Sequence, residues 1–411
     1  MDSDNTLIIL AAPNVSEQMG GEAMKALNIF TECKKAYPNT IQITHERNKG
    51  ELSDRLKLDN VYYIEDTWLD KLLAKSKLTG IFLNWIFSRN VVKKAEALAV
   101  ELGKENSKDV IVWQTEPNSP VIPRTVSSIY KNCFGPINGN IYYPPIFQHH
   151  EKFVIKFRRL LHLPLQRVNR LFFKGITKAD AILCAGGERT TSSLLAAGCP
   201  ENIMIDSLDC GIKDELLQRE RVVHSGNNYK FIHFGRLVFH KGTALIIRSL
   251  PKTKTPIVLD IVGQGPELEK CKLLAEELGV SDRVNFLGWY VDHADLIKSM
   301  NDYRGFVLPS MEDANGIVVQ ESMTLGLPAI CLDWGGPQLL VDHGETGYLV
   351  EPVSVDHITT EIAQYMDTLA EDDALAERMS VRSVEKAQSW RWSPLIVEWV
   401  EALKKQLKIA Q

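Results

Sequence analysis

Residues Gly305–Val350, GFVLPSMEDANGIVVQESMTLGLPAICLDWGGPQLLVDHGETGYLV, decide the fold of this 411-residue chain. The apolar run Gly305–Leu308 is short enough for a buried parallel strand. A polar turn follows it, and from Ile317 the apolar spacing is typical of a helix that ends at Gly326. Ala329–Leu332 has the pattern of a second short strand. The order strand, loop, helix, strand predicts a βαβ unit in a parallel sheet.

Two carboxylates stand near the start of this predicted helix. In open α/β sheets, ligands bind outside the carboxyl ends of the strands, so we expect Asp313 and Glu321 to flank a ligand site there. Acidic residues near a helix N-terminus are also ordinary capping chemistry. The two carboxylates alone therefore leave both interpretations open.

The composition is that of a globular protein with enough apolar residues for two cores, since 45% of residues are apolar and 24% charged. A net charge of −5 argues against bulk nucleic-acid binding. Seven cysteines without a C-x-x-C pair favour a reduced cytosol over a disulfide framework or a zinc site. Met1–Asn5 lacks a signal-peptide pattern, and the apolar run Leu78–Phe87 is shorter than the about 18 residues of a membrane span. We therefore expect a cytoplasmic protein.

Short apolar strands alternate with amphipathic helices along the chain, and the alternation restarts after the polar segment Asp214–Asn228. We predict two Rossmann-like α/β domains, residues 1–212 and 213–389. A C-terminal helix, residues 390–411, is expected to cross back to the first domain. The Gly and Pro residues of Phe134–Pro145 predict an irregular loop.

Glycine-rich loops follow predicted strands in both halves. Gly20 and Gly21 stand between the first strand and a helix, where N–H groups would allow a diphosphate to approach. Taken alone, this pair of glycines favours a plain tight turn. In the second half, Arg236 and Lys241 follow the first strand. The rigid, planar guanidinium of Arg236 and the flexible ammonium group of Lys241 are both suited to binding an anion. Glycines at the strand ends of this half are Gly235, Gly263, Gly265 and Gly288.

A hydride-transferring dehydrogenase is the main structural rival for this pattern. Its G-x-G-x-x-G fingerprint should follow the first strand of a domain. Gly263 and Gly265 follow a later strand, and Leu268 occupies the third glycine position. The spacing therefore disfavours a dehydrogenase.

The segment Lys152–Lys178 holds eight Lys or Arg and no Asp or Glu, interleaved with apolar residues. Pro164 predicts that it splits into two short helices. Two interpretations stay open. Basic amphipathic helices lie on anionic membrane surfaces, whereas surface helices of ordinary domains pack their apolar faces inward.

The order of motifs between Tyr229 and Glu351 resembles the donor domain of the retaining GT-B glycosyltransferases of family 4. These motifs are FGRLVFHKG, VGQGPELE, DRVNFLG, PSMEDANGIVVQE, GLPAI, GG and GETGYLV. The N-terminal half resembles the family more loosely, through GGEA and ADAILCAGG. The resemblance implies a GT-B fold, with two Rossmann-like domains that face a central cleft. It also implies transfer of a sugar with retention from a nucleotide diphosphate sugar to a hydroxyl, in bacterial polysaccharide or glycolipid assembly.

The same resemblance assigns roles to individual residues. Arg236 and Lys241 would hold the diphosphate, Glu321 would bind the ribose hydroxyls, and the region of Gly288 would border the base. The family motif is Glu-x7-Glu, and this chain has Asp313 in first place, with Glu312 one residue out of register. The turn expected to contact sugar and phosphate comprises Asp313, Asn315, Gly316, Ile317 and Val318. The glycines expected beside the donor are Gly20, Gly21, Gly235, Gly263 and Gly265.

The chain departs from the family in the first half. Many relatives carry a His near the end of the strand Val110–Trp113 that approaches the sugar, and here Gln114, Thr115 and Glu116 follow instead. Asp2-Ser3-Asp4, the only Asp-x-Asp, precedes the first strand, so we expect a metal-independent enzyme. No cofactor is implied besides the donor substrate.

Two alternatives would use the same donor site. One is a GT-B epimerase or hydrolase that needs no acceptor, and the other is a nucleotide-sugar-binding relative without catalysis. The partners implied are a nucleotide-sugar donor and a glycan or glycolipid acceptor, with no nucleic acid. Contact with an anionic membrane through Lys152–Lys178 would place the protein on the inner face of the plasma membrane.

Overall fold

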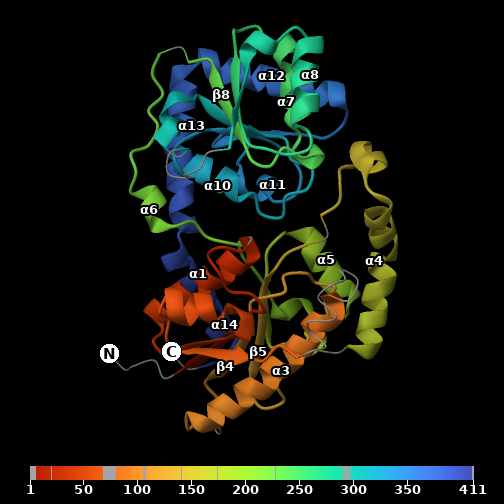
Figure 1. The fold of residues 1–411 in the computed structure, drawn as a ribbon, viewed down its shortest axis with the longest axis vertical. Helices are drawn as coiled ribbons and strands as arrows, with labels where there is room; N and C mark the ends of the chain where they lie inside the picture. The colour runs from red at the N-terminus through yellow and green to blue at the C-terminus, as the bar shows by residue number, and fades with distance from the viewer. Residues whose placement is uncertain are drawn as a thin grey trace. The chain divides into compact units, whose positions relative to one another are not determined.

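The structure, a computed structural model, describes residues 6–409 except 20, 68–79, 105–107, 140, 174, 227, 290–295 and 297. The chain forms two compact units (Figure 1). Unit 1 comprises Met1–Asn140, Phe157–Gly211 and Trp392–Gln411. Unit 2 comprises Ile141–Lys156 and Ile212–Arg391. Each unit contains a parallel sheet with helices packed on it, which confirms the predicted α/β class.

The sheet of unit 1 has seven parallel strands in the order β3-β2-β1-β4-β5-β6-β7. Its central strands are continuous apolar runs because helices cover both faces of a parallel sheet. The strands are β1 (Leu7–Ala11), β2 (Thr40–His45), β3 (Val61–Ile64), β4 (Val110–Gln114), β5 (Lys131–Ile137), β6 (Ala181–Cys184) and β7 (Met204–Asp206). The strand order reverses between β1 and β4, the point at which open α/β sheets bind ligands.

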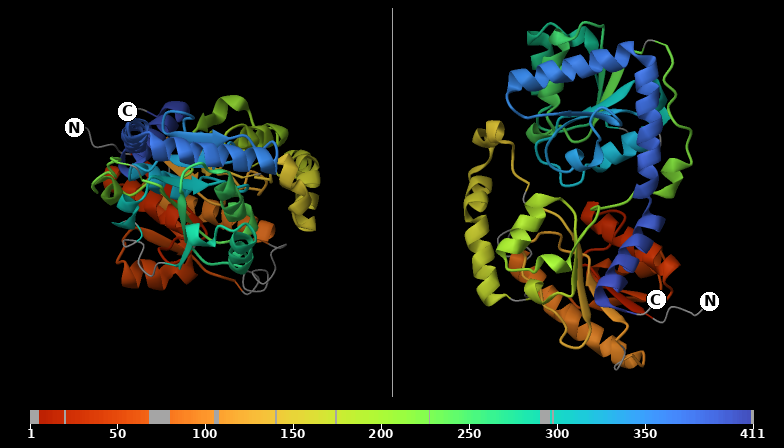
Figure 2. Two further views of the ribbon diagram at one scale, coloured as in Figure 1. Left: turned by 90° about the horizontal axis from the view of Figure 1, so that it is seen from above. Right: turned by 180° about the vertical axis from the view of Figure 1, so that it is seen from behind.

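The C-terminal helix α14 (Trp392–Leu407) packs in unit 1, beside α1 (Gly21–Ala36), as Figure 2 shows. Trp399 of α14 meets the buried Trp113 edge-on, with ring centroids 6.3 Å apart. The Tyr37 hydroxyl donates a hydrogen bond of 3.0 Å to Glu401. The predicted return of the last helix is therefore confirmed. Further helices among the described residues of unit 1 are α3 (Gly80–Glu101), α5 (Glu188–Ala196) and α4 (Phe153–Phe172), which begins in unit 2.

The sheet of unit 2 has six parallel strands in the order β10-β9-β8-β11-β12-β13. They are β8 (Lys230–Phe234), β9 (Val258–Val262), β10 (Val284–Gly288), β11 (Gly305–Leu308), β12 (Ala329–Leu332) and β13 (Gly347–Val350). The helices of this unit within the described residues are α6 (Asp214–Leu217), α7 (Thr243–Ser249), α8 (Leu268–Glu277), α10 (Ile317–Thr324), α11 (Pro337–Leu340), α12 (Val355–Glu371) and α13 (Asp373–Ala387). The predicted βαβ unit is therefore present as β11, α10 and β12.

Two local predictions were wrong, and both involve proline. The expected loop Phe134–Pro145 begins with the end of β5, because Phe134 and Ile137 still pair with β6 across a register shift at Gly135-Pro136. Bulges are where strands accommodate proline. Pro164 does not split its segment, since α4 is one helix over Phe153–Phe172. This proline lies on the exposed side of α4, where a helix can bend away from the ring.

The polar composition of Asp214–Asn228 predicts a linker between the two domains, but the described residues of this segment belong to unit 2. Arg221 donates to Ser380 at 2.9 Å and forms a two-point ion pair with Glu377, which holds the pKa of that carboxyl at about 2. His224 is also buried here and contacts the Gly326 carbonyl at 2.9 Å. The residue patterns of 66–75 and 292–299 also predict helices, and these two ranges lie largely outside the described residues.

Candidate functional site

The candidate site of unit 2 lies at the carboxyl ends of its strands. The strand order reverses between β8 and β11, so the loops that follow these two strands are neighbours at a topological switch point. The first of these loops carries Arg236 and Lys241, and the second carries Asp313. The topology therefore brings the predicted cations and the predicted carboxylate to one place in unit 2.

The loop after β8 lies directly on the loop after β9. The Leu237 N–H donates to the Gln264 carbonyl at 2.9 Å, and the Gly235 N–H donates to the Val262 carbonyl at 3.0 Å. A Cβ on Gly263 would lie 1.9 Å from the Gly235 carbonyl oxygen, and one on Gly265 would lie 2.2 Å from that of Leu237. Gly263 and Gly265 thus have a packing reason, because any side chain at either position would force the two loops apart.

The loop after β8 is also joined to the loop after β11. The Met311 N–H and the Ser310 hydroxyl both donate to the His240 carbonyl, at 2.7 Å and 3.1 Å. Gly242 has φ +73°, and a Cβ there would lie 2.2 Å from the Pro309 carbonyl oxygen. This close backbone approach sets the position of the neighbouring Lys241.

Lys241 and Asp313 form the ion pair at the centre of the site. The Lys241 Nζ donates to both carboxylate oxygens, at 2.7 Å and 2.8 Å. The two side chains are only 14% and 16% exposed, so solvent screens their attraction less than at an open surface. Glu312 lies elsewhere, with a carboxylate oxygen 4.0 Å from His240 Nδ1. Of the two adjacent acids, Asp313 is the one that contacts the cation.

Arg236 is exposed beside this ion pair. Within the part of the chain that the structure describes, its guanidinium has no hydrogen bond or ion pair. Burial, and then the charges of Lys241 and Arg236, hold the pKa of His240 below its usual range. Arg236 and Lys241 thus both act on the same histidine at the switch point of unit 2.

The turn before α10 is held by the loop after β12. The Gly336 N–H donates to the Asp313 carbonyl at 2.8 Å, and a Cβ on Gly335 would lie 2.7 Å from the same oxygen. Gly316 has φ +79° and precedes the first residue of α10. Asn315, which was expected to contact the donor, donates to Gln320 Oε1 at 2.7 Å. Its side-chain amide therefore contributes to the form of the turn.

Helix α10 presents one face that is not buried. Ile317 is 46% exposed and stands one turn before the half-buried Glu321, on the same side of the helix. The N–H groups of Ile317 and Val318 precede the first bonds within α10, so they are available to an anion in the way helix N-termini are. Gly288 lies at the end of β10, where its carbonyl accepts from the Gly263 N–H at 2.7 Å. The next residue, Trp289, is 56% exposed.

Residues that sequence reasoning did not place in this unit lie beside the site. The predicted first domain, 1–212, included 141–156, but the structure groups this segment with unit 2. Tyr143 packs against Phe239 and His240, with ring centroids 6.0 Å and 6.4 Å apart. Trp334 donates to the Tyr142 carbonyl at 2.7 Å. In the sequence, only the two consecutive tyrosines, Tyr142 and Tyr143, in a predicted loop indicated that this segment could lie beside a ligand site.

In unit 1, Glu116 follows β4 at the corresponding switch point. Its carboxyl is 3% exposed, and its Oε1 has no hydrogen-bond partner in the described structure. Burial, followed by the charge of Glu22, raises the pKa of Glu116 to about 8. A buried ion pair of 2.9 Å joins Lys25 to Asp209, and the charges of both also act on Glu116. Gly21 is the first residue of α1, and Gly20 lies outside the described residues.

The other two residues at the end of β4 are used inside unit 1. Gln114 accepts from Ser88 at 2.7 Å and donates to the Thr125 carbonyl at 2.8 Å. The Thr115 hydroxyl donates to the Ala11 carbonyl at 3.3 Å. Of the three residues that stand where relatives have a His, Glu116 is therefore the one with an unsatisfied polar atom.

Nothing in the described part of the chain gathers three or more metal-ligating side chains of the kind His, Cys, Asp or Glu. All seven cysteines are free and buried.

Two parallel-sheet units of this kind define a GT-B glycosyltransferase fold. The chain is similar in structure to the lipopolysaccharide outer core galactosyltransferase WaaB, with a TM-score of 0.66 and 15% identity over 97% of this chain and 99% of that one. It is also similar to Anabaena HepE in complex with UDP, with a TM-score of 0.62 and 17% identity over 97% and 100%. The predicted GT-B fold is confirmed.

The second unit contains the family signature. Residues 214–383 match the family Glycosyl transferases group 1. A GDP-mannose-dependent alpha-(1-6)-phosphatidylinositol monomannoside mannosyltransferase of Mycobacterium tuberculosis (strain CDC 1551 / Oshkosh) is 30% identical over 207 residues, 48% of this chain and 52% of that protein. An N-acetyl-alpha-D-glucosaminyl L-malate synthase of Bacillus anthracis is 31% identical over 174 residues, 42% and 44%. The chain spans about half the length of these relatives.

The junction at Gly242 gives a test of how the site is held. Gly242→Ala should destabilise the protein more than Gly279→Ala, which has a similar φ of +66° but no heavy atom within 4 Å of the added Cβ. Both substitutions carry the left-handed penalty of about 1–2 kcal/mol, and the contact with Pro309 should add about 1–3 kcal/mol at Gly242 only. Urea unfolding of both variants measures the difference. Equal losses of unfolding free energy in the two variants would show that the loops after β8 and β11 can move apart without destabilising the protein.

Proposed function

We propose that this protein transfers a sugar, with retention of configuration, from a nucleotide diphosphate sugar to a hydroxyl acceptor in bacterial polysaccharide or glycolipid assembly. The observation that supports this most is the Lys241–Asp313 pair beside the exposed Arg236 at the switch point of unit 2. The Mycobacterium tuberculosis relative is named as dependent on GDP-mannose, and HepE has been solved with UDP-glucose. Both are consistent with a nucleotide-sugar donor.

The chemistry explains why cations are needed at this place. The bond between the anomeric carbon and the diphosphate oxygen breaks, and its electron pair stays on the diphosphate. A bond forms from the acceptor oxygen to the anomeric carbon, and the hydroxyl proton passes to the departing diphosphate. Negative charge therefore grows on the leaving oxygens, and fixed cations stabilise that charge most in the transition state. Arg236 and Lys241 are the residues that we assign to this role.

Asp313 has a positioning role in this proposal. It holds the Lys241 Nζ through both carboxylate oxygens, so the flexible lysine chain is ordered before a donor arrives. Ordering a catalytic group in advance removes part of the entropy cost of the reaction. The Asp at this position thus orients the ammonium group, while the ammonium group faces the diphosphate.

Helix α10 provides the remaining donor contacts. The N–H groups of Ile317 and Val318 are placed to bind a phosphate or a sugar oxygen. Glu321 lies on the same face, and we assign it to the ribose hydroxyls, for which a carboxylate is a strong acceptor. The region of Gly288 and the exposed Trp289 would border the base.

The experiment that tests the function has two stages. A thermal-shift screen with UDP, GDP and other nucleoside diphosphates identifies the base, because a ligand that binds only the native state raises its stability by mass action. The matching nucleotide sugars are then incubated with and without candidate hydroxyl acceptors, and the anomeric configuration of the product is determined by NMR. Diphosphate release without an acceptor would instead establish a hydrolase or epimerase, and binding without turnover would establish a binding protein.

Glu321→Gln should weaken donor binding about 10- to 150-fold, since loss of one charged hydrogen-bond partner costs about 1.5–3 kcal/mol. Calorimetric titration with the nucleoside diphosphate measures this change. Glu276→Gln on α8 is the control, because this residue is exposed and lies on a different helix. An unchanged affinity in Glu321→Gln would remove this residue from the ribose site.

Arg236→Ala and Lys241→Ala should lower kcat more than they raise KM, because their charges act on the leaving group in the transition state. The matched control is Lys252→Ala. Lys252 also pairs with an aspartate, Asp356 at 2.6 Å, but it precedes β9 and so lies at the opposite edge of the sheet. Steady-state kinetics separate the two parameters. A rise in KM alone would mean that the cations bind only the ground-state phosphate.

Activity should persist after treatment with EDTA. In this proposal Arg236 and Lys241 supply the positive charge that a divalent ion supplies in metal-dependent transferases. Turnover is measured before and after chelation, with later addition of Mg²⁺ or Mn²⁺. Loss of activity that either ion restores would contradict the assignment.

A further inference from the structure

Helix α4 differs from an ordinary surface helix, because the two side chains that it buries against the protein are polar. Gln166 and Asn169 lie one turn apart and are buried. The Gln166 amide donates to the Pro120 carbonyl at 3.0 Å and to Ser193 Oγ at 2.8 Å. The Asn169 amide donates to the Val121 carbonyl at 2.9 Å. Hydrogen bonds from amides, and not an apolar seam, therefore hold this part of α4 on unit 1.

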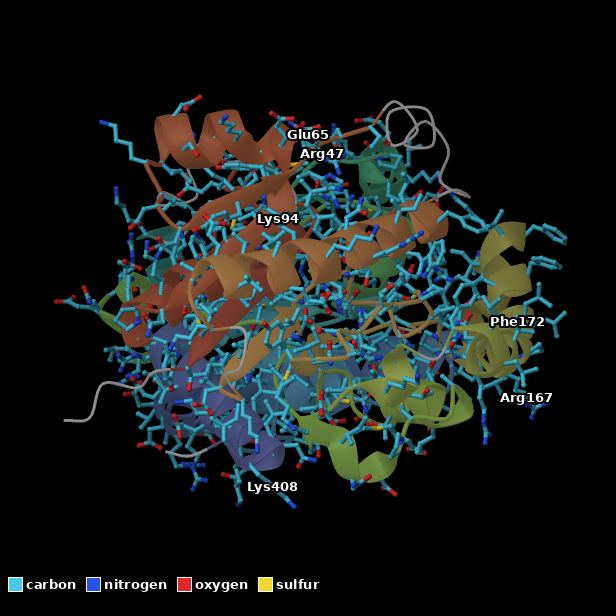
Figure 3. All side chains as sticks on the ribbon, turned by 90° about the horizontal axis from the view of Figure 1, so that it is seen from below. Arg47, Glu65, Lys94, Arg167, Phe172 and Lys408 are labelled. Atoms are coloured by element: carbon cyan, nitrogen blue, oxygen red, sulfur yellow. The ribbon has the colours of Figure 1, made fainter. Side chains whose placement is uncertain are left out.

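The opposite side of α4 is apolar and exposed. Leu160 and Phe172 are each 74% exposed, and Leu171 is 70% exposed. Apolar residues recur every three or four positions, so they form one stripe along the helix. The stripe comprises Phe153, Phe157, Leu160, Leu161, Pro164, Val168, Leu171 and Phe172. Figure 3 shows the side chains of α4 at the margin of the structure, with Arg167 and Phe172 among them. The expectation that apolar faces of this segment pack on their own domain is therefore wrong.

The exposed stripe is bordered by positive charge. The basic residues described in the segment are Lys152, Lys156, Arg158, Arg159, Arg167, Arg170 and Lys178. The sequence from 152 to 178 contains no Asp or Glu, although the whole chain has a net charge of −5. The positive charge is thus concentrated beside the apolar stripe, which gives this surface a preference for negatively charged partners.

We propose that α4 docks the protein on the surface of an anionic lipid bilayer. The helix would lie in the plane of the interface, with the stripe inserted among the acyl chains and the basic residues at the lipid headgroups. Its 20 residues span about 30 Å, so the apolar contact extends along the whole helix. In the described structure, no helix combines the length and the apolar character needed to cross a bilayer.

Charge also argues against a second copy of the chain as the occupant. A two-fold dimer through α4 would place the same basic surface on both sides of the interface. Like charges would then face each other around the apolar stripe, which is unfavourable. Anionic headgroups, in contrast, complement both features of the helix at once.

The inference does not rest on the proposed sugar transfer, because binding to lipid needs no turnover. Flotation of the full chain with vesicles tests it directly. The vesicles are phosphatidylcholine alone and phosphatidylcholine with phosphatidylglycerol in equal amounts. Salt is set at about 0.01 M and about 1 M, where the Debye length falls from about 30 Å to about 3 Å. We expect flotation with the anionic vesicles at low salt and a loss of about tenfold or more at high salt.

Two double variants separate the apolar and the charged parts of the surface. Leu160→Ser with Phe172→Ser should abolish flotation, and Arg158→Glu with Arg167→Glu should abolish it at low salt. The control is Leu273→Ser with Arg248→Glu, since these residues are exposed on α8 and α7. The control should float like the wild type. Thermal unfolding midpoints and titration with the nucleoside diphosphate verify that every variant is folded and still binds the donor.

Three outcomes would overturn the proposal. The wild type would stay unbound with every vesicle, the control would lose flotation as much as the α4 variants, or neutral vesicles would bind as well as anionic ones. Light scattering on the same samples adds a further check. A wild-type dimer that Leu160→Ser with Phe172→Ser converts to a monomer would assign the stripe to self-association instead of lipid.

Discussion

The ion pair between Lys241 and Asp313 ties together the two loops on which the candidate site depends. It joins the first strand of unit 2 to the strand at which the sheet order reverses, so it lies at the position where α/β folds bind ligands. A partly buried ion pair contributes little net stability, because desolvation of the charges opposes their attraction. Its value here is geometric. It holds a flexible ammonium group beside the point where the backbones of Gly242 and Pro309 approach each other. Only a glycine fits at position 242, because a Cβ there would clash with the Pro309 carbonyl.

The same principle, in which close backbone contact places a side chain, recurs around the site. Gly263 and Gly265 let the loop after β9 lie on the loop after β8, and Gly335 and Gly336 bring the loop after β12 to the Asp313 carbonyl. Four loops, those after β8, β9, β11 and β12, are therefore in contact, and two of them carry the residues of the site. Such a site is rigid because each loop is hydrogen-bonded to its neighbour and not only to its own strand.

Helix α4 packs on its unit in a different way from most other helices, through polar contacts. Most helices of the chain bury apolar residues, yet α4 is attached through Gln166 and Asn169 and leaves its leucines outside. Buried amides are tolerated because their N–H groups meet carbonyls of the 120–121 segment and of α5. An exposed apolar stripe of this length is costly in water, which is why we assign it to a lipid surface.

The sequence by itself determined the strands, the βαβ unit at Gly305–Leu332, the order of motifs and hence the GT-B fold. Apolar runs and glycine positions are local signals, and the parallel topology follows from their alternation. Only the tertiary structure decided that Asp313 and not Glu312 meets Lys241, because adjacent residues of a turn point in different directions and spacing does not say which faces the neighbouring loop. It also decided that residues 141–156 lie with unit 2 and that Glu116 is left with an unsatisfied oxygen. An amphipathic pattern likewise defines two faces of α4, but which of them packs inward depends on the carbonyls that unit 1 presents to it, and these come from segments far away in the chain.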